Sequence, residues 1–144
     1  MSLYQHVLIA IDLTEESSQV IEKAQIIAAG AKISVIHVSQ PLTQLYGNEI
    51  GINLTNIEAD LFKRAKELLS QRVESFDVPE DEQHLAIGKP STEIRRYAEE
   101  IKADLIVIGS HSRHGLGLLL GSTANGVLHG ASCDVLAVKI DTGN

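Results

Sequence analysis

The residues best suited to chemistry lie in one stretch, DLIVIGSHSRHGLGLLLGST, which spans residues 104–123. Its aliphatic run ends at Gly109, where we expect a tight turn, and the polar segment that follows closes with Gly121, Ser122 and Thr123. Ser122 is a favoured residue for the N-terminal cap of a helix. A strand, a glycine-rich loop and a helix N-terminus present backbone N–H groups and a helix dipole to an anion, commonly a phosphate. The stretch therefore predicts an anion-binding site.

Other chemistries fit this stretch less well. The glycines of residues 115–121 resemble a dinucleotide fingerprint, but their spacing is one residue too long, and no Walker A or Gly-x-Ser-x-Gly sequence is present. The serines and histidines of residues 110–114 lie in a glycine-rich loop, which is a poor place to hold a catalytic triad. Their histidines, with the distant His129 and Cys133, do not have a typical zinc spacing. We expect neither a catalytic residue nor a metal site.

The elements that must position this stretch are aliphatic runs alternating with amphipathic helical patterns. The expected strands are residues 7–11, 33–38, 84–87, 105–108 and 134–140. The expected helices are residues 14–30, 55–76, 90–101 and 122–130, and residues 39–53 form a long loop. This alternation predicts an α/β fold, with a five-stranded, open parallel sheet and helices on both faces.

Two helix details follow from the pattern. Thr14 is the expected N-cap of the first helix, followed by two glutamates that complement the helix dipole. The long helix should bury one apolar face, made of Ile57, Leu61, Ala65, Leu68, Leu69 and Val73.

Three residues at the ends of expected strands could line one crevice. Ligands of such folds bind beyond the carboxyl ends of the strands, where the strand order reverses, and Asp12, Val38 and Gly109 lie at such ends. Two questions stay open. Asp12 either meets a ligand or caps the turn into the next helix. Ser122 and Thr123 either bind a ligand or only cap their own helix.

Composition narrows the function class. The 144 residues predict a single domain, 1–144, and the absence of tryptophan among 44% apolar residues predicts an aliphatic core. A net charge of −7 argues against broad binding of nucleic acid or of an anionic membrane. A single cysteine, Cys133, suits the reducing cytoplasm. No signal-peptide pattern or membrane-spanning run is recognisable, so we expect a soluble cytoplasmic protein.

Five segments resemble the universal stress protein family: LIAIDLTEES, IHV, IGKPSTEI, ADLIVIGSHS and LLLGSTANGVLHGASCDVLAVKI. The resemblance covers about residues 4–140. It implies a Rossmann-like sheet of the adenine nucleotide alpha hydrolase type, usually in a homodimer. It also implies induction under stress or growth arrest and no established catalytic chemistry.

The nucleotide-binding branch of that family has a glycine, two residues, a glycine, nine residues and then Gly-Ser or Gly-Thr. Here Gly109 matches the first glycine and Gly121-Ser122 the closing pair, while Ser112 replaces the second glycine and the spacer, residues 113–120, has eight residues. A serine in a left-handed conformation costs on the order of 1 kcal/mol, or about fivefold in affinity, and the shorter spacer shifts the closing amides. By this resemblance, the residues that would meet a nucleotide are Asp12 and Val38 at the adenosine and Gly109, His111, Ser112, Gly121, Ser122 and Thr123 at the phosphates.

We therefore expect a dimeric, cytoplasmic stress-response module that binds ATP or AMP in a regulatory, non-catalytic way. The alternative is a nucleotide-free stress protein that acts through its surface. The final strand, from Asp134 to Ile140, carries few charges and is expected at a sheet edge, where its unpaired backbone groups would pair with a second copy. A loop that covers this edge is the alternative to the homodimer.

Overall fold

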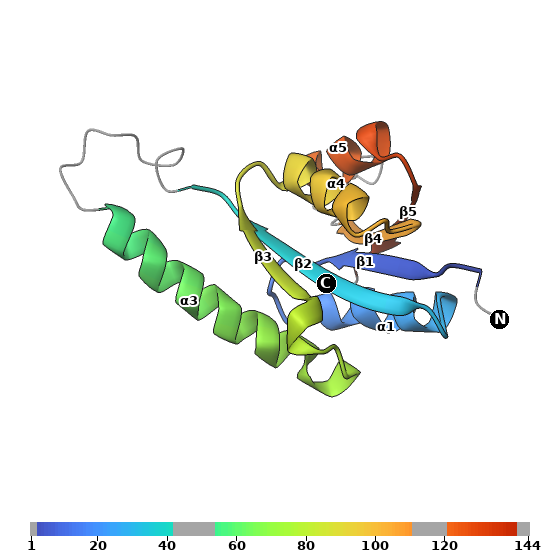
Figure 1. Cartoon of the computed structure of the whole chain (residues 1–144), viewed down its shortest axis with the longest axis horizontal. Helices are drawn as coiled ribbons and strands as arrows, with labels where there is room; N and C mark the ends of the chain where they lie inside the picture. Colours follow the sequence, from blue (N-terminus) through green and yellow to red (C-terminus); the bar gives the residue numbers. More distant parts are fainter. Residues whose placement is uncertain (1–2, 42–53, 111–120, 141–144) are drawn as a thin grey trace.

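The computed structural model of the protein describes residues 3–41, 54–110 and 121–140 (Figure 1). Within these residues, five parallel strands form one sheet in the order β3-β2-β1-β4-β5. The strands are β1 (His6–Ala10), β2 (Lys32–Ser39), β3 (Gln83–Ile87), β4 (Leu105–Ser110) and β5 (Asp134–Lys139). The expected open parallel sheet is confirmed.

Helices cover both faces of the sheet. They are α1 (Ser17–Ile27), α3 (Leu54–Val73), α4 (Pro90–Glu100) and α5 (Ser122–Gly130), with short 3-10 turns η1 (Glu74–Phe76) and η2 (Glu80–Glu82). Residues of α1 and α3 share one buried cluster, and residues of α4 and α5 share the other, so the pairs of helices lie on opposite faces (Figure 1). None of the described helices is long and apolar enough to cross a membrane.

The core is aliphatic and lies in two layers, one on each face of the sheet. Successive side chains of a strand point to opposite faces, so Val7 and Ile9 of β1 pack with α1 and α3, while Leu8 packs with α4 and α5. In β4, Val107 is 0% exposed, as expected of a central strand. Burial on both faces explains the unbroken aliphatic runs of the sequence.

Gly109 does not form the expected tight turn, and that prediction was wrong. The residue lies within β4, opposite Val138 of β5, and is not among the described glycines with a positive φ. Its neighbours explain the glycine instead. A Cβ on Gly109 would lie 2.5 Å from Cδ1 of Ile140 and 3.2 Å from Cγ2 of Val20. Gly109 therefore provides space for packing rather than conformational freedom.

Two expected helix caps are also corrected. Thr14 does not cap α1, which begins at Ser17 after Glu16; instead the Thr14 carbonyl accepts hydrogen bonds from the Ser17 amide at 3.1 Å and the Ser17 hydroxyl at 2.6 Å. Ser122 is the first residue of α5 rather than its cap, because Gly121 occupies the cap position and no side chain caps that end. In both helices the N-cap is a residue other than the one that the cap preferences of the side chains predict.

Only part of the expected apolar face of α3 is buried. Leu69 and Val73 are each 1% exposed, whereas Ile57 and Leu61 are 38% and 47% exposed. Figure 1 shows the reason: the N-terminal half of α3 extends away from the sheet, past the edge strand β3. Helical periodicity identifies an apolar face, but it does not tell how much of that face finds a partner.

Candidate functional site

A crevice of about 320 Å³ lies at the carboxyl ends of β1, β2 and β4. The strand order reverses between β1 and β4, and this is the position at which open parallel sheets bind ligands. Asp12, Val38, Gly109 and Thr123 line the crevice, so the structure brings these four expected residues together. Their elements are the turn after β1, the end of β2, the end of β4 and the first turn of α5.

The other expected site residues have different positions. Gly121 and Ser122 lie at the start of α5, next to Thr123, and both are exposed. Gly121 has φ 85° and ψ 154°, and a Cβ on it would meet nothing within 4 Å. Position 121 therefore needs a glycine because of its backbone conformation, and not because a side chain would clash with a neighbour. His111 and Ser112 lie outside the described residues.

The lining of the crevice is mostly aliphatic. Its branched side chains come from both faces of the sheet and are Ile11, Val20, Ile36, Val38, Ile94, Ile108 and Ile140. The described polar side chains are few: Asp12, Ser17, His37, Gln40 and Thr123. An apolar cavity with a few polar groups suits a flat ring, and the N–H groups in the first turn of α5, which have no partner within the helix, suit an anion.

The turn that carries Asp12 is both a structural feature and part of the crevice wall. Oδ1 of Asp12 accepts hydrogen bonds from the Thr14 amide at 3.1 Å and from the Thr14 hydroxyl at 2.7 Å. Asp12 therefore caps this turn, as one of its two interpretations predicts. The same residue is exposed and lines the crevice, so capping does not exclude contact with a ligand. Leu13, which lies between Asp12 and Thr14, has φ 68°. This left-handed conformation costs a non-glycine residue about 1–2 kcal/mol.

Sequence reasoning missed three polar residues of the crevice, His37, Ser17 and Gln40. Nδ1 of His37 lies 2.8 Å from the carbonyl oxygen of Ile11, which can only accept, so Nδ1 carries the hydrogen. Ser17 is 1% exposed and donates its hydroxyl to the Thr14 carbonyl. His37 precedes Val38 at the same strand end, and that position was a usable signal. Ser17 gave no such signal, since a serine in the first turn of a helix is common.

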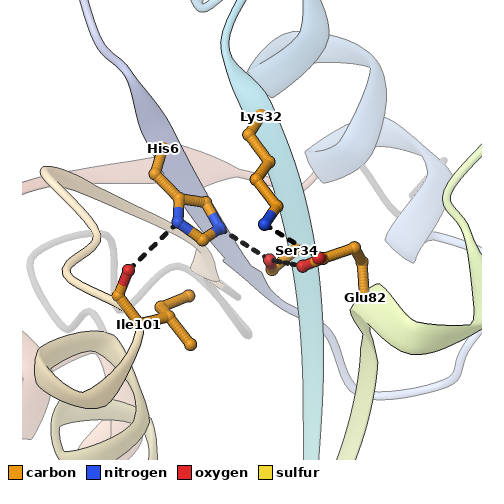
Figure 2. Close-up of polar contacts among 5 residues, drawn as sticks. All are labelled: His6, Lys32, Ser34, Glu82 and Ile101. Carbon is orange, nitrogen blue, oxygen red and sulfur yellow. Dashed lines mark hydrogen bonds and ion pairs between the residues drawn. The ribbon is translucent and has the colours of Figure 1, made fainter.

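A second polar cluster lies at the opposite, amino end of the sheet (Figure 2). Nδ1 of His6 is 3.1 Å from the Ile101 carbonyl oxygen, and Nε2 of His6 is 2.7 Å from Oγ of Ser34. Ser34, which is 0% exposed, donates to Glu82, and Nζ of Lys32 is 3.1 Å from the other Glu82 oxygen. This cluster joins β1, β2, η2 and the end of α4, and it is not part of the crevice.

Hydrogen bonds and burial shift the pKa values of several groups outside the crevice. Burial opposes ionisation of Glu82, but hydrogen bonds from Ser34 and Lys32 and the Lys32 charge prevail and lower the pKa of its carboxyl. Hydrogen bonds from the Gln5 and His6 amides lower the pKa of Asp104. Burial raises the pKa of the Cys133 thiol, which disfavours a reactive thiolate.

No described group of three His, Cys, Asp or Glu side chains is placed to hold a metal ion. This observation covers residues 3–41, 54–110 and 121–140, so it includes His129 and Cys133, and His111 and His114 fall outside it.

Comparisons with known proteins agree with one another. A family model for the universal stress protein family matches residues 3–139. A universal stress protein A homolog from Coxiella burnetii is 41% identical over 138 residues, which cover 94% of this chain and 96% of that protein. The crystal structure of a universal stress protein in complex with cAMP is 26% identical, with a TM-score of 0.69 and coverage of 97% and 100%. A universal stress protein from Lactobacillus plantarum has a TM-score of 0.72, 20% identity and coverage of 94% and 97%, and shares the fold.

Proposed function

The chain belongs to the universal stress protein family, and from this premise we propose that it is a stress-response module that binds ATP or AMP in its crevice. The observation that carries the proposal is the convergence of Asp12, Val38, Gly109 and Thr123 on one apolar cavity at the point of strand reversal. Those residues come from four separate elements, and the resemblance matches Asp12, Val38 and Gly109 to positions of the nucleotide-binding branch.

The chemistry of the cavity supports a ligand with an aromatic ring at one end and an anion at the other. We place the adenine ring against the aliphatic wall that includes Ile36 and Val38. The ribose lies near Asp12, whose carboxylate accepts hydrogen bonds from hydroxyl groups. The phosphates lie near Gly109 and the start of α5, where N–H groups without helical partners favour negative charge. The related protein solved with cAMP, itself an adenine nucleotide, supports this ligand class.

The proposed binding is regulatory and non-catalytic. Asp12, Ser17 and His37 all line the crevice, and each hydrogen-bonds a backbone group of the β1–α1 turn. Side chains that maintain a turn are poorly placed to exchange protons with a substrate. We place the module in the cytoplasm, in keeping with its single, free Cys133.

We further propose a homodimer formed through β5. This strand is an edge of the described sheet, and Val135, Leu136 and Ala137 are only partly buried. Pairing β5 with its own copy, over the segment from Asp134 to Ile140, satisfies the outward backbone groups and closes the edge.

The ligand proposal is tested by the protein as purified. Denaturation should release an adenine nucleotide, identified by mass and by absorbance near 260 nm. Titration calorimetry of protein cleared of ligand should show ATP or AMP binding and much weaker GTP binding. Incubation with ATP should release no phosphate above the background. Absence of both bound and titratable nucleotide would favour the nucleotide-free alternative, and steady phosphate release would contradict the non-catalytic part.

A further inference from the structure

The turn between β1 and α1 contains a residue in an unfavourable conformation. Leu13 has φ 68°, in the left-handed region, which is rare for a bulky side chain. Such a conformation persists only where surrounding contacts hold it. Because Oδ1 of Asp12 is bonded to Thr14, the Asp12 carboxylate moves with this turn. The contacts that hold Leu13 therefore determine where Asp12 lies in the crevice.

Contacts from other elements hold the turn at two of its carbonyl groups. Nε of Arg72 donates to the Leu13 carbonyl over 2.8 Å, and Nδ1 of His37 donates to the Ile11 carbonyl over 2.8 Å. The Leu13 side chain packs against the buried cluster on the α1 face. His37 also lines the crevice, so its effect on a ligand would be direct.

Arg72 differs from His37 because it acts from outside the crevice. It lies in the last turn of α3, and none of the described residues lining the crevice belongs to α3. Any effect of the Arg72 Nε–H on a ligand must therefore pass through Leu13, whose carbonyl it holds. The positive charge of Arg72 also interacts favourably with the C-terminal end of the helix dipole. That interaction requires only a cation, whereas the contact with Leu13 requires an N–H at the ε position.

We propose that Arg72 is a positioning residue for the crevice. Its Nε–H holds the Leu13 carbonyl, keeps the turn in its left-handed form and so keeps Asp12 facing the ligand. The ligand itself rests on the proposed function, whereas the hold of Arg72 on the turn does not.

Substitutions at Arg72 can separate the N–H from the charge. Arg72→Gln places an amide nitrogen at the ε position and removes the charge. Arg72→Lys keeps the charge but places a methylene there, and Arg72→Met has neither. We expect Arg72→Met and Arg72→Lys to weaken ATP binding about tenfold and Arg72→Gln less than about threefold. Lys63→Met, at an exposed position of the same helix, is the control and should bind as the wild type does.

Hydrogen exchange supplies a readout without nucleotide. The Thr14 amide, which donates to Asp12, should exchange faster in Arg72→Met and Arg72→Lys than in the wild type or Arg72→Gln. If the wild type binds no ATP but this pattern of exchange is seen, the proposed function fails and the role of Arg72 in the turn stands.

Two results would overturn the inference. One is unchanged affinity and exchange in Arg72→Met. The other is loss of binding in Arg72→Gln with retention in Arg72→Lys, which would show that charge alone matters. If Arg72→Met does not fold, the comparison of Arg72→Gln with Arg72→Lys decides, because both keep a long polar side chain.

Discussion

Nε2 of His6 lies 2.7 Å from Oγ of Ser34, and the Ser34 hydroxyl donates its single hydrogen to Glu82 (Figure 2). Ser34 therefore has only an acceptor to offer His6. The other ring nitrogen of His6, Nδ1, faces the Ile101 carbonyl, which also only accepts. His6 therefore contacts both the Ser34–Glu82 pair and the end of α4.

The first prediction is that the ring nitrogens of His6 stabilise the fold. His6→Phe keeps an aromatic ring but removes both nitrogens, so the Ser34 hydroxyl and the Ile101 carbonyl each lose a contact. We expect this variant to lower the free energy of unfolding by about 1–3 kcal/mol. Urea denaturation measures the change, with His129→Phe at an exposed position as the control. A His6→Phe variant as stable as the wild type would contradict this role.

The second prediction concerns acid stability and Glu82. Its carboxyl has a lowered pKa, so it stabilises the fold above its unfolded pKa, and the stabilisation is lost as the pH falls through the folded pKa. Glu82→Gln should therefore be less stable than the wild type at neutral pH, with the difference shrinking as the pH falls below the ordinary glutamate pKa of 4.5. Urea denaturation at several pH values measures this, with Glu80→Gln at an exposed position as control. Parallel pH profiles would refute the role of Glu82.

The third prediction concerns the packing of Gly109 against Ile140. Gly109→Ala places a methyl group 2.5 Å from Cδ1 of Ile140 and should destabilise the fold by about 1–3 kcal/mol. Ile140→Val removes that atom, so the alanine should cost less in the Ile140→Val background. Chemical denaturation of the two single variants and the double variant measures the coupling. Strictly additive effects would show that Ile140 is not what excludes a side chain.

The fourth prediction concerns Gly121. Its φ of 85° and ψ of 154° belong to a region almost restricted to glycine, so Gly121→Val should cost the fold about 1–3 kcal/mol. A shift of the neighbouring amides should also weaken ATP binding at least about tenfold, which corresponds to about 1.4 kcal/mol. Calorimetry and an unfolding curve measure the two effects separately. A folded variant with unchanged affinity would remove this segment from the site.

The fifth prediction uses the direction of the backbone groups of β5. The Ile140 amide donates to Ser110 of β4, and N–H directions alternate along a strand, so the Val138 amide also faces β4 and the Ala137 amide faces outward. Ala137→Pro should give a folded monomer, whereas Val138→Pro should mainly destabilise the domain. Light scattering and circular dichroism check this pair. A wild type that is monomeric at micromolar concentration, or a dimeric Ala137→Pro, would contradict pairing through β5.

The crevice shows where local patterns suffice and where they fail. The ends of β1 and β2 can be recognised from the sequence, and the residues expected there, Asp12 and Val38, both line the crevice. Leu13 carries no local signal for a left-handed conformation, because that conformation results from the core beneath its side chain and from Arg72 on a distant helix. The sequence predicts a turn at Gly109, but the glycine is needed because the side chain of Ile140, which follows β5, approaches it.

The sequence by itself determined the elements and their class. Aliphatic runs and helical periodicity arise from which faces are buried, and burial is read within a few residues of chain. Only the tertiary structure decided the order of the strands, the cluster of His6, Ser34 and Glu82, and how far α3 extends past the sheet. These features depend on contacts between residues far apart in the chain, and the energy of such contacts has no counterpart in local spacing.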